Sequence, residues 1–144
     1  MGTFTTTTSI ETMLVGSTLQ NGTAAASLCI TQAEAEIRNQ LSKRYDVSAA
    51  EFQTSTSTPP MITKICLWLS LGYFFQMSSR GGPESIKRGK TFIDQAMQNL
   101  KDLGNSEIDL VGTTGSQVAE IGTYKGMTST TKNYAPTFNE DDQT

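Results

Sequence analysis

The chain has 144 residues, the length of a single domain. Its net charge of −3 and pI of about 4.9 argue against a dedicated nucleic-acid binder, because such proteins neutralise phosphates with Lys and Arg. It has no His, and its two cysteines, Cys29 and Cys66, stand far apart in apolar surroundings, so we expect no catalytic, metal or cofactor site.

Residues 1–27 are predicted to form an N-terminal arm with one short helix. The first eight residues are rich in Thr, and β-branched residues favour extended structure. Ser9 can cap a helix that places Ile10, Met13 and Leu14 on one face. A short helix of this kind needs a larger body to pack against, which we expect in residues 28–111.

The first substantial helix is predicted to begin near Thr31. Thr31 and Glu34 have the spacing of a capping box, in which the hydroxyl and the carboxylate satisfy free backbone amides at a helix start. An apolar stripe follows at every fourth residue: Ala33, Ile37, Leu41 and Tyr45. A polar loop over residues 46–57 comes next.

A second helix is predicted to open at Pro59-Pro60 and to run through the apolar stretch 61–77. This stretch contains Lys64 and is shorter than the roughly 20 apolar residues of a membrane span, so we expect a buried helix and no membrane association. An all-round apolar helix must be buried all round. Two flanking helices of one subunit cannot do this, so either the domain covers the helix unusually well or other subunits cover it. Interface aromatics are expected at Trp68, Tyr73, Phe74 and Phe75.

A third helix is predicted to start at Pro83 and to stop at Gly104 in the left-handed conformation. Its apolar positions are spaced alternately by three and four residues: Ile86, Gly89, Ile93, Ala96, Leu100 and Leu103. We therefore predict a mainly α fold, a small three- to four-helix bundle with an extended N-terminal arm and a long C-terminal tail.

The tail is predicted to follow a short strand at residues 107–111. Residues 112–144 carry too little apolar surface to offset their own ordering entropy. Sparse anchors nevertheless recur along them, and we expect these to contact a protein partner: Tyr124, Tyr134, Pro136 and Phe138. The alternative is a tail that stays disordered.

The glycine-containing loop 80–85 precedes the third helix, and such loops can bind phosphate. Gly89-Lys90-Thr91 has the ending of a P-loop, but Glu84 stands where the earlier glycine is required, so the motif fails. The basic residues Lys87, Arg88 and Lys90 therefore indicate either a solvated face or a contact with another subunit.

Three segments in this order resemble the head-completion, or head–tail connector (adaptor), proteins of tailed bacteriophages over roughly residues 28–111. The first is a helix ending in basic residues and an aromatic, Glu36-Ile37-Arg38 through Lys43-Arg44-Tyr45-Asp46. The second is a Pro-opened apolar helix, Pro60-Met61-Ile62 to Gly72-Tyr73-Phe74-Phe75. The third ends in Ala96-Met97-Gln98-Asn99-Leu100-Lys101-Asp102-Leu103-Gly104.

The resemblance implies a non-enzymatic virion protein that is assembled in the host bacterial cytoplasm. It implies a homo-oligomeric ring of about twelve copies between the portal and a tail or stopper protein, with DNA passing through the lumen without specific binding. Two alternatives remain open at this point. One is a DNA-binding helical module such as a small packaging (terminase) subunit, and the other is a small enzyme or its regulator.

Overall fold

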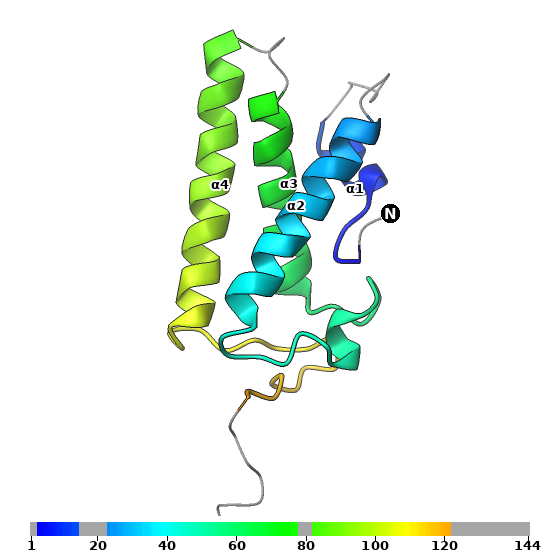
Figure 1. Ribbon diagram of the computed structural model, residues 1–144, viewed down its shortest axis with the longest axis vertical. Helices are drawn as coiled ribbons and strands as arrows, with labels where there is room; N and C mark the ends of the chain where they lie inside the picture. Colours follow the sequence, from blue (N-terminus) through cyan, green and yellow to red (C-terminus); the bar gives the residue numbers. More distant parts are fainter. Residues whose placement is uncertain (1–2, 15–22, 78–81, 122–144) are drawn as a thin grey trace, which may run out of the picture.

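The computed structural model describes residues 3–14, 23–77 and 82–121, and it is mainly α-helical, as the sequence predicts. The helices run roughly along one axis, with α3 at the centre and α2 crossing in front of it (Figure 1). The described elements are α1 (Thr7–Met13), α2 (Thr23–Leu41), the 3-10 turn η1 (Ala50–Phe52), α3 (Pro60–Met77) and α4 (Gly82–Gly104).

The N-terminal arm is part of the folded body. Phe4 is fully buried in the main core, its backbone N–H donates to Glu34 Oε1 at 2.7 Å, and the Arg38 guanidinium lies 4.7 Å from its ring centroid. Helix α1 is capped by Thr6, whose hydroxyl accepts from the Ser9 backbone N–H at 3.3 Å. The prediction that Ser9 is the cap is therefore wrong.

Helix α2 begins at Thr23, earlier than predicted. Thr31 lies in its interior, where the hydroxyl donates to the Ser27 carbonyl at 3.0 Å, and Glu34 accepts from the arm. The capping-box prediction is therefore wrong. The residues before Thr31 are rich in Ala, the best helix former. Ala26 and Ile30 are buried in a second apolar cluster, and this burial stabilises the additional N-terminal turns of the helix.

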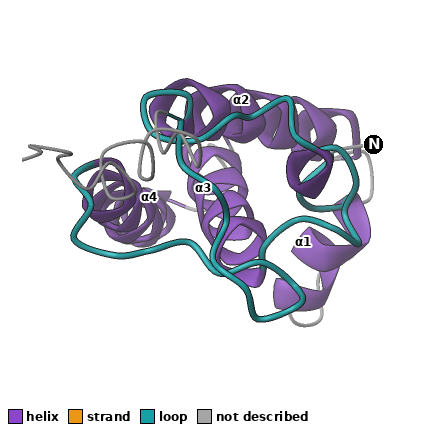
Figure 2. Ribbon diagram, turned by 90° about the horizontal axis from the view of Figure 1, so that it is seen from below, coloured by secondary structure: helices purple, strands orange, loops and turns teal. Residues whose placement is uncertain are grey.

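Helix α3 starts at Pro60, as predicted, and has helices on three sides (Figure 2). Ile62, Ile65 and Leu69 are fully buried in the main core. Glycines allow α4 to approach closely: a Cβ on Gly72 would lie 2.5 Å from Ile93 Cγ1 and 2.8 Å from the Gly89 carbonyl oxygen. Larger side chains at this crossing would force the two helices apart.

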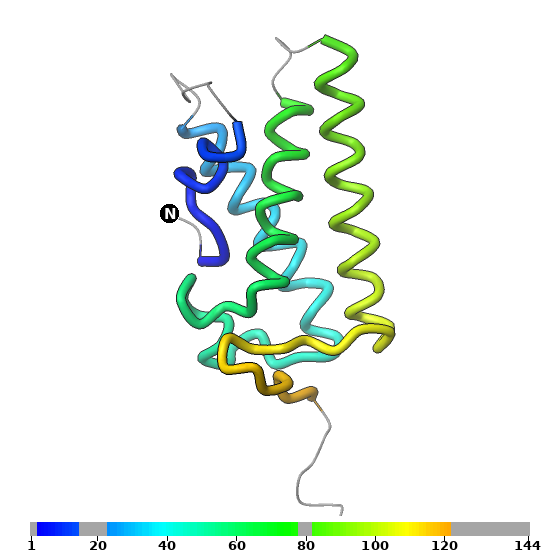
Figure 3. Tube along the Cα trace, turned by 180° about the vertical axis from the view of Figure 1, so that it is seen from behind, coloured from blue at the N-terminus to red at the C-terminus, as the bar shows by residue number. Residues whose placement is uncertain are grey.

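The chain turns back after α4 and runs across the lower end of the bundle (Figure 3). Gly104 was predicted to be the left-handed residue at the end of α4, but that residue is Ser106 (φ 63°). The Glu107 N–H donates to the Asp102 carbonyl at 3.0 Å and closes the helix end. The described residues form no strand at 107–111, in contrast to the prediction; isolated bridges pair Val111 with Gln117 and Tyr45 with Glu120.

Candidate interaction surfaces and the Arg44 anchor

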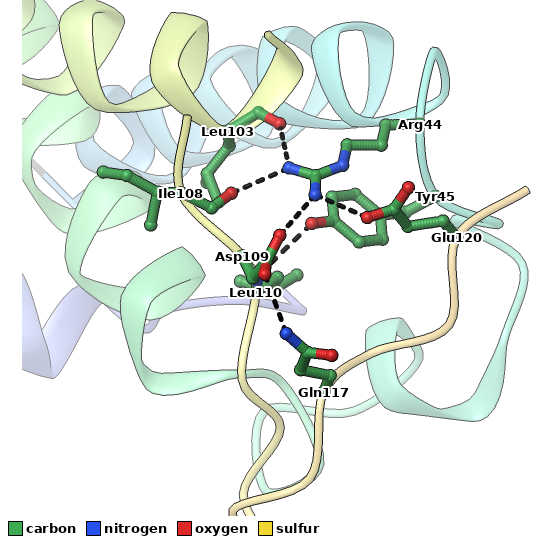
Figure 4. Close-up of polar contacts among 8 residues, drawn as sticks. All are labelled: Arg44, Tyr45, Leu103, Ile108, Asp109, Leu110, Gln117 and Glu120. Carbon is green, nitrogen blue, oxygen red and sulfur yellow. Dashed lines mark hydrogen bonds and ion pairs between the residues drawn. The ribbon is translucent and has the colours of Figure 1, made fainter. Parts of the chain in front are cut away.

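Arg44, just after the end of α2, is the centre of the densest polar network in the described residues (Figure 4). Its side chain is 7% exposed. One terminal nitrogen donates to the carbonyls of Leu103 at 2.8 Å and Ile108 at 2.7 Å; the other meets Asp109 Oδ1 and Glu120 Oε1, each at 2.5 Å. One guanidinium thus joins α2, the end of α4 and two points of the returning segment.

Neighbouring contacts extend this anchor. The Tyr45 hydroxyl accepts from the Leu110 backbone N–H at 3.2 Å, and the Gln117 amide donates to Asp109 Oδ2 at 2.7 Å. The Ile121 N–H donates to the Arg44 carbonyl at 2.7 Å. Segment 105–121 is therefore held near both of its ends against Arg44 and Tyr45, which follow α2.

Electrostatics and burial both act at this anchor. The hydrogen bond to Glu120 is the main reason that the pKa of Arg44 rises above its usual value, so the guanidinium stays charged. Burial raises the pKa of Tyr45, a residue that is only 1% exposed. Because Asp109 and Glu120 remain 52% and 39% exposed, the two carboxylates keep much of their hydration while they neutralise the buried cation.

No pattern in the sequence indicates that segment 105–121 is anchored in this way. The side-chain partners of Arg44 lie 59 to 76 residues away in the chain. The sequence feature that could have indicated burial of this segment is the pairing of carboxylates with nearby apolar residues: Asp109 precedes Leu110, and Glu120 follows Val118 by two residues. Leu110 is 1% and Val118 9% exposed, so both join the main core.

The four aromatics of α3 that were expected at an interface do not form one patch. At 100° per residue, Trp68 and Phe75 share a side of the helix, whereas Tyr73 and Phe74 point to two other sides. Trp68 and Tyr73 pack against the main core, and the Lys64 ammonium lies 4.6 Å from the Trp68 ring centroid. Phe74 and Phe75 pack against the second cluster, where Phe75 stacks on Phe92 of α4 at 6.2 Å.

The chain itself covers most of α3. All four aromatics are half-buried, and Leu71 is only 2% exposed because Ile10 of α1 shares its cluster. Of the two alternatives drawn from the apolar sequence, the well-covered domain therefore holds for most of the helix, since α1 adds a third flanking helix. Covering by other subunits is not required to bury α3.

The large apolar side chains that remain exposed gather at the two ends of the bundle. Figure 1 shows that α1 ends, α2 and α4 begin and α3 ends at the same end of the molecule. Near it lie Met13, Leu28, Met77 and Ile86, each between 47% and 56% exposed. At the other end, the returning segment exposes Ile108, Val111 and Ile121.

The basic residues of α4 form a separate exposed surface. Lys87, Arg88 and Lys90 are all exposed, and none of them makes an ion pair with a residue that the structure describes. Lys87 and Arg88, with Phe92, line a shallow pocket of about 440 Å³ along the same helix. This surface is suited to an anionic partner, although Glu84 also lines the pocket.

Metal-ligating side chains are dispersed over residues 3–14, 23–77 and 82–121. No group of three acidic or sulfur side chains is placed to hold a metal there. Cys66 is buried, and burial raises its pKa to about 12, which makes it a poor nucleophile. Nor is any helix in these ranges long and apolar enough to cross a membrane.

The other four predicted interface residues lie outside the described residues: Tyr124, Tyr134, Pro136 and Phe138. No family model, no curated protein and no solved structure matches this chain.

Proposed function

We propose that this protein is a virion structural protein, a head-to-tail connector (adaptor) subunit that forms a homo-oligomeric ring and carries out no catalysis. The ring, of about twelve copies, sits between the portal and a tail or stopper protein in the virion, after assembly in the host bacterial cytoplasm. DNA passes through its lumen without specific binding, in keeping with the net charge of −3.

The observation that carries the proposal is the Arg44 anchor. It fixes the returning segment up to Ile121 at one end of the bundle, so residues 122–144 start from a defined point. A connector subunit needs an extension of this kind to reach a neighbour, and the expected anchor residues lie in this part of the sequence: Tyr124, Tyr134, Pro136 and Phe138.

The exposed apolar ends of the bundle give further support. A subunit between two partners needs one contact surface at each end, and the bundle has exposed Met77 and Ile86 at one end and exposed Val111 and Ile121 at the other. Apolar side chains of this size are stable in contact with a partner and costly in water. Function would then follow from shape and contacts alone.

Assembly of the purified chain, alone and with a portal protein, tests the proposal. We expect rings in negative-stain electron micrographs and a matching mass by light scattering. Ile86→Glu should abolish assembly, because a charge would be buried at the contact, whereas Thr91→Glu, an exposed position on the same helix, should leave it intact. A chain that stays monomeric and ignores the portal would contradict the proposal.

A second candidate is a DNA-binding helical module, such as a small packaging (terminase) subunit, favoured by the exposed and unpaired Lys87, Arg88 and Lys90 among the described residues. Binding through these residues would weaken steeply with salt. Replacing all three with Gln would remove about three phosphate contacts and lower the slope of log K against log salt concentration accordingly. A gel-shift series across salt concentrations decides: the absence of any shift removes this candidate.

A further inference from the structure

A groove lies between the C-terminal halves of α2 and α4, at the end of the bundle where Figure 1 shows the two helices side by side. Its volume is about 520 Å³. Met97 is half-buried at its base, and Leu100 beneath is 1% exposed. The polar residues around these two are Gln40, Lys43, Asp94, Gln98, Lys101, Gly104 and Asn105.

The groove is cationic on a chain that is acidic overall. Among its lining residues Lys43 and Lys101 outnumber the one carboxylate, Asp94, while the neighbouring Asp102 carboxylate accepts from the lining Gln98 at 2.7 Å. Lys43 donates to the neutral Gln40 at 3.0 Å, and neither lysine forms an ion pair within the part of the chain that the structure describes. An apolar base flanked by two unpaired ammonium groups suits an acidic peptide with an aromatic or aliphatic anchor.

The chain supplies such a peptide from a nearby point. The described residues end at Ile121, whose N–H is bonded to the carbonyl of Arg44, the residue after Lys43 of the groove. Beyond it, the sequence from Tyr134 to Phe138 is followed, after Asn139, by Glu140-Asp141-Asp142. The residues between Ile121 and Tyr134 can span roughly 40 Å, so reach does not limit a return to the groove.

We propose that the segment 134–142 docks in the α2–α4 groove of its own chain, with Phe138 or Tyr134 over Met97 and the acidic run beside Lys43 and Lys101. The covalent tether raises the effective concentration of the segment to the millimolar range, which favours its own groove over a second copy in dilute solution. In a role that rests on the connector proposal, docking stores the tail until a neighbouring subunit or the portal displaces it.

Disulfide trapping in the full-length protein tests this docking. We pair Gln98→Cys, an exposed groove position, with Thr137→Cys in the tail. The control pairs Thr137→Cys with Glu107→Cys, which is exposed at the same end of the bundle but does not line the groove. The native Cys29 and Cys66 are fully buried, so they compete little for the oxidant. Products are separated on non-reducing gels and mapped by mass spectrometry.

We expect the groove pair to form its intramolecular disulfide about tenfold faster than the control pair, as a docked rather than a freely moving tail requires. Adding Lys43→Glu and Lys101→Glu should remove this difference, and reversing the acidic run to Lys in the same protein should restore it. Equal rates for the two pairs, or a predominantly intermolecular disulfide, would overturn the docking. The experiment uses the unassembled chain, so its outcome is independent of whether rings form.

Discussion

Helix α3 and the segment 105–121 are both essential to the fold, but they are held in opposite ways. Helix α3 is buried by apolar contacts on three sides, from α1, α2 and α4, and its buried Ser70 hydroxyl donates to the Cys66 carbonyl within the helix. Segment 105–121 contributes two buried apolar residues, Leu110 and Val118, and one guanidinium binds three of its residues, Ile108, Asp109 and Glu120.

The two regions should therefore respond differently to a substitution. Apolar burial is non-directional and spread over many residues, so damage at one point of α3 lowers the stability of the whole bundle. A network centred on Arg44 is directional, so its loss should free one segment and leave the helices folded.

Leu69→Ala should produce the largest effect of the single substitutions. Leu69 is 0% exposed at the centre of α3, and its truncation should lower the free energy of unfolding by about 3 kcal/mol through lost burial and a cavity. Leu28→Ala is the matched control, because Leu28 is 56% exposed and the same truncation there should cost at most about 0.5 kcal/mol. Urea denaturation followed by circular dichroism measures both; equal losses would show that α3 is not the centre of the core.

Arg44→Met should cost about 2 kcal/mol, and the cost should be local. The change leaves the carbonyls of Leu103 and Ile108 without their donor, while the exposed Asp109 and Glu120 return to water. In hydrogen exchange, the amides of segment 105–121 should lose protection while those of α3 keep it.

Lys43→Met is the control for this prediction, since Lys43 is a neighbouring, exposed cation whose side-chain hydrogen bond within the described chain goes to Gln40. It should leave exchange in segment 105–121 unchanged. Uniform loss of protection in Arg44→Met, including α3, would mean that the segment and the bundle unfold as one unit and would remove the contrast between the two regions.

The same contrast explains what could be predicted from the sequence. The positions of α3 and α4 follow from contiguous signals, an apolar run opened by Pro60 and a periodic pattern opened by Pro83. The Arg44 anchor joins residues 59 to 76 positions apart, and no local pattern marks such a contact. A strand was predicted at 107–111 because alternating apolar residues favour one, but side chains, rather than a partner strand, hold this segment.

Two errors at helix ends have a similar origin. Thr31 and Glu34 have the spacing of a capping box, yet the carboxylate is used by the backbone of Phe4, a contact across 30 residues. Gly104 is the residue type that usually ends a helix, yet the left-handed position falls on Ser106, where the turn delivers Ile108 and Asp109 to Arg44. Tertiary contacts overrode the local preference at both ends.

Alkaline pH should destabilise the α3 region through Cys66. Burial raises the pKa of this thiol from 9.0 to about 12, so the unfolded chain releases the proton first as pH rises. The stability from the neutral buried thiol is complete below pH 9 and is lost between pH 9 and 12, at up to about 1.4 kcal/mol per pH unit. Cys66→Ala should flatten this slope in urea titrations at several pH values; an unchanged slope would assign the alkaline loss to other groups.

The smallest effects should come from the carboxylates that face Arg44. Asp109→Asn and Glu120→Gln each remove one charge from a pair whose acidic member is 52% or 39% exposed, so each should cost less than about 1 kcal/mol. The double variant should cost more than the sum of the two, because the buried guanidinium then has no counter-charge within hydrogen-bonding distance among the described residues. Amide exchange of segment 105–121 in the four proteins of this cycle measures the coupling. Strict additivity would mean that the backbone carbonyls of Leu103 and Ile108 alone fix Arg44, and that the carboxylates only shield its charge.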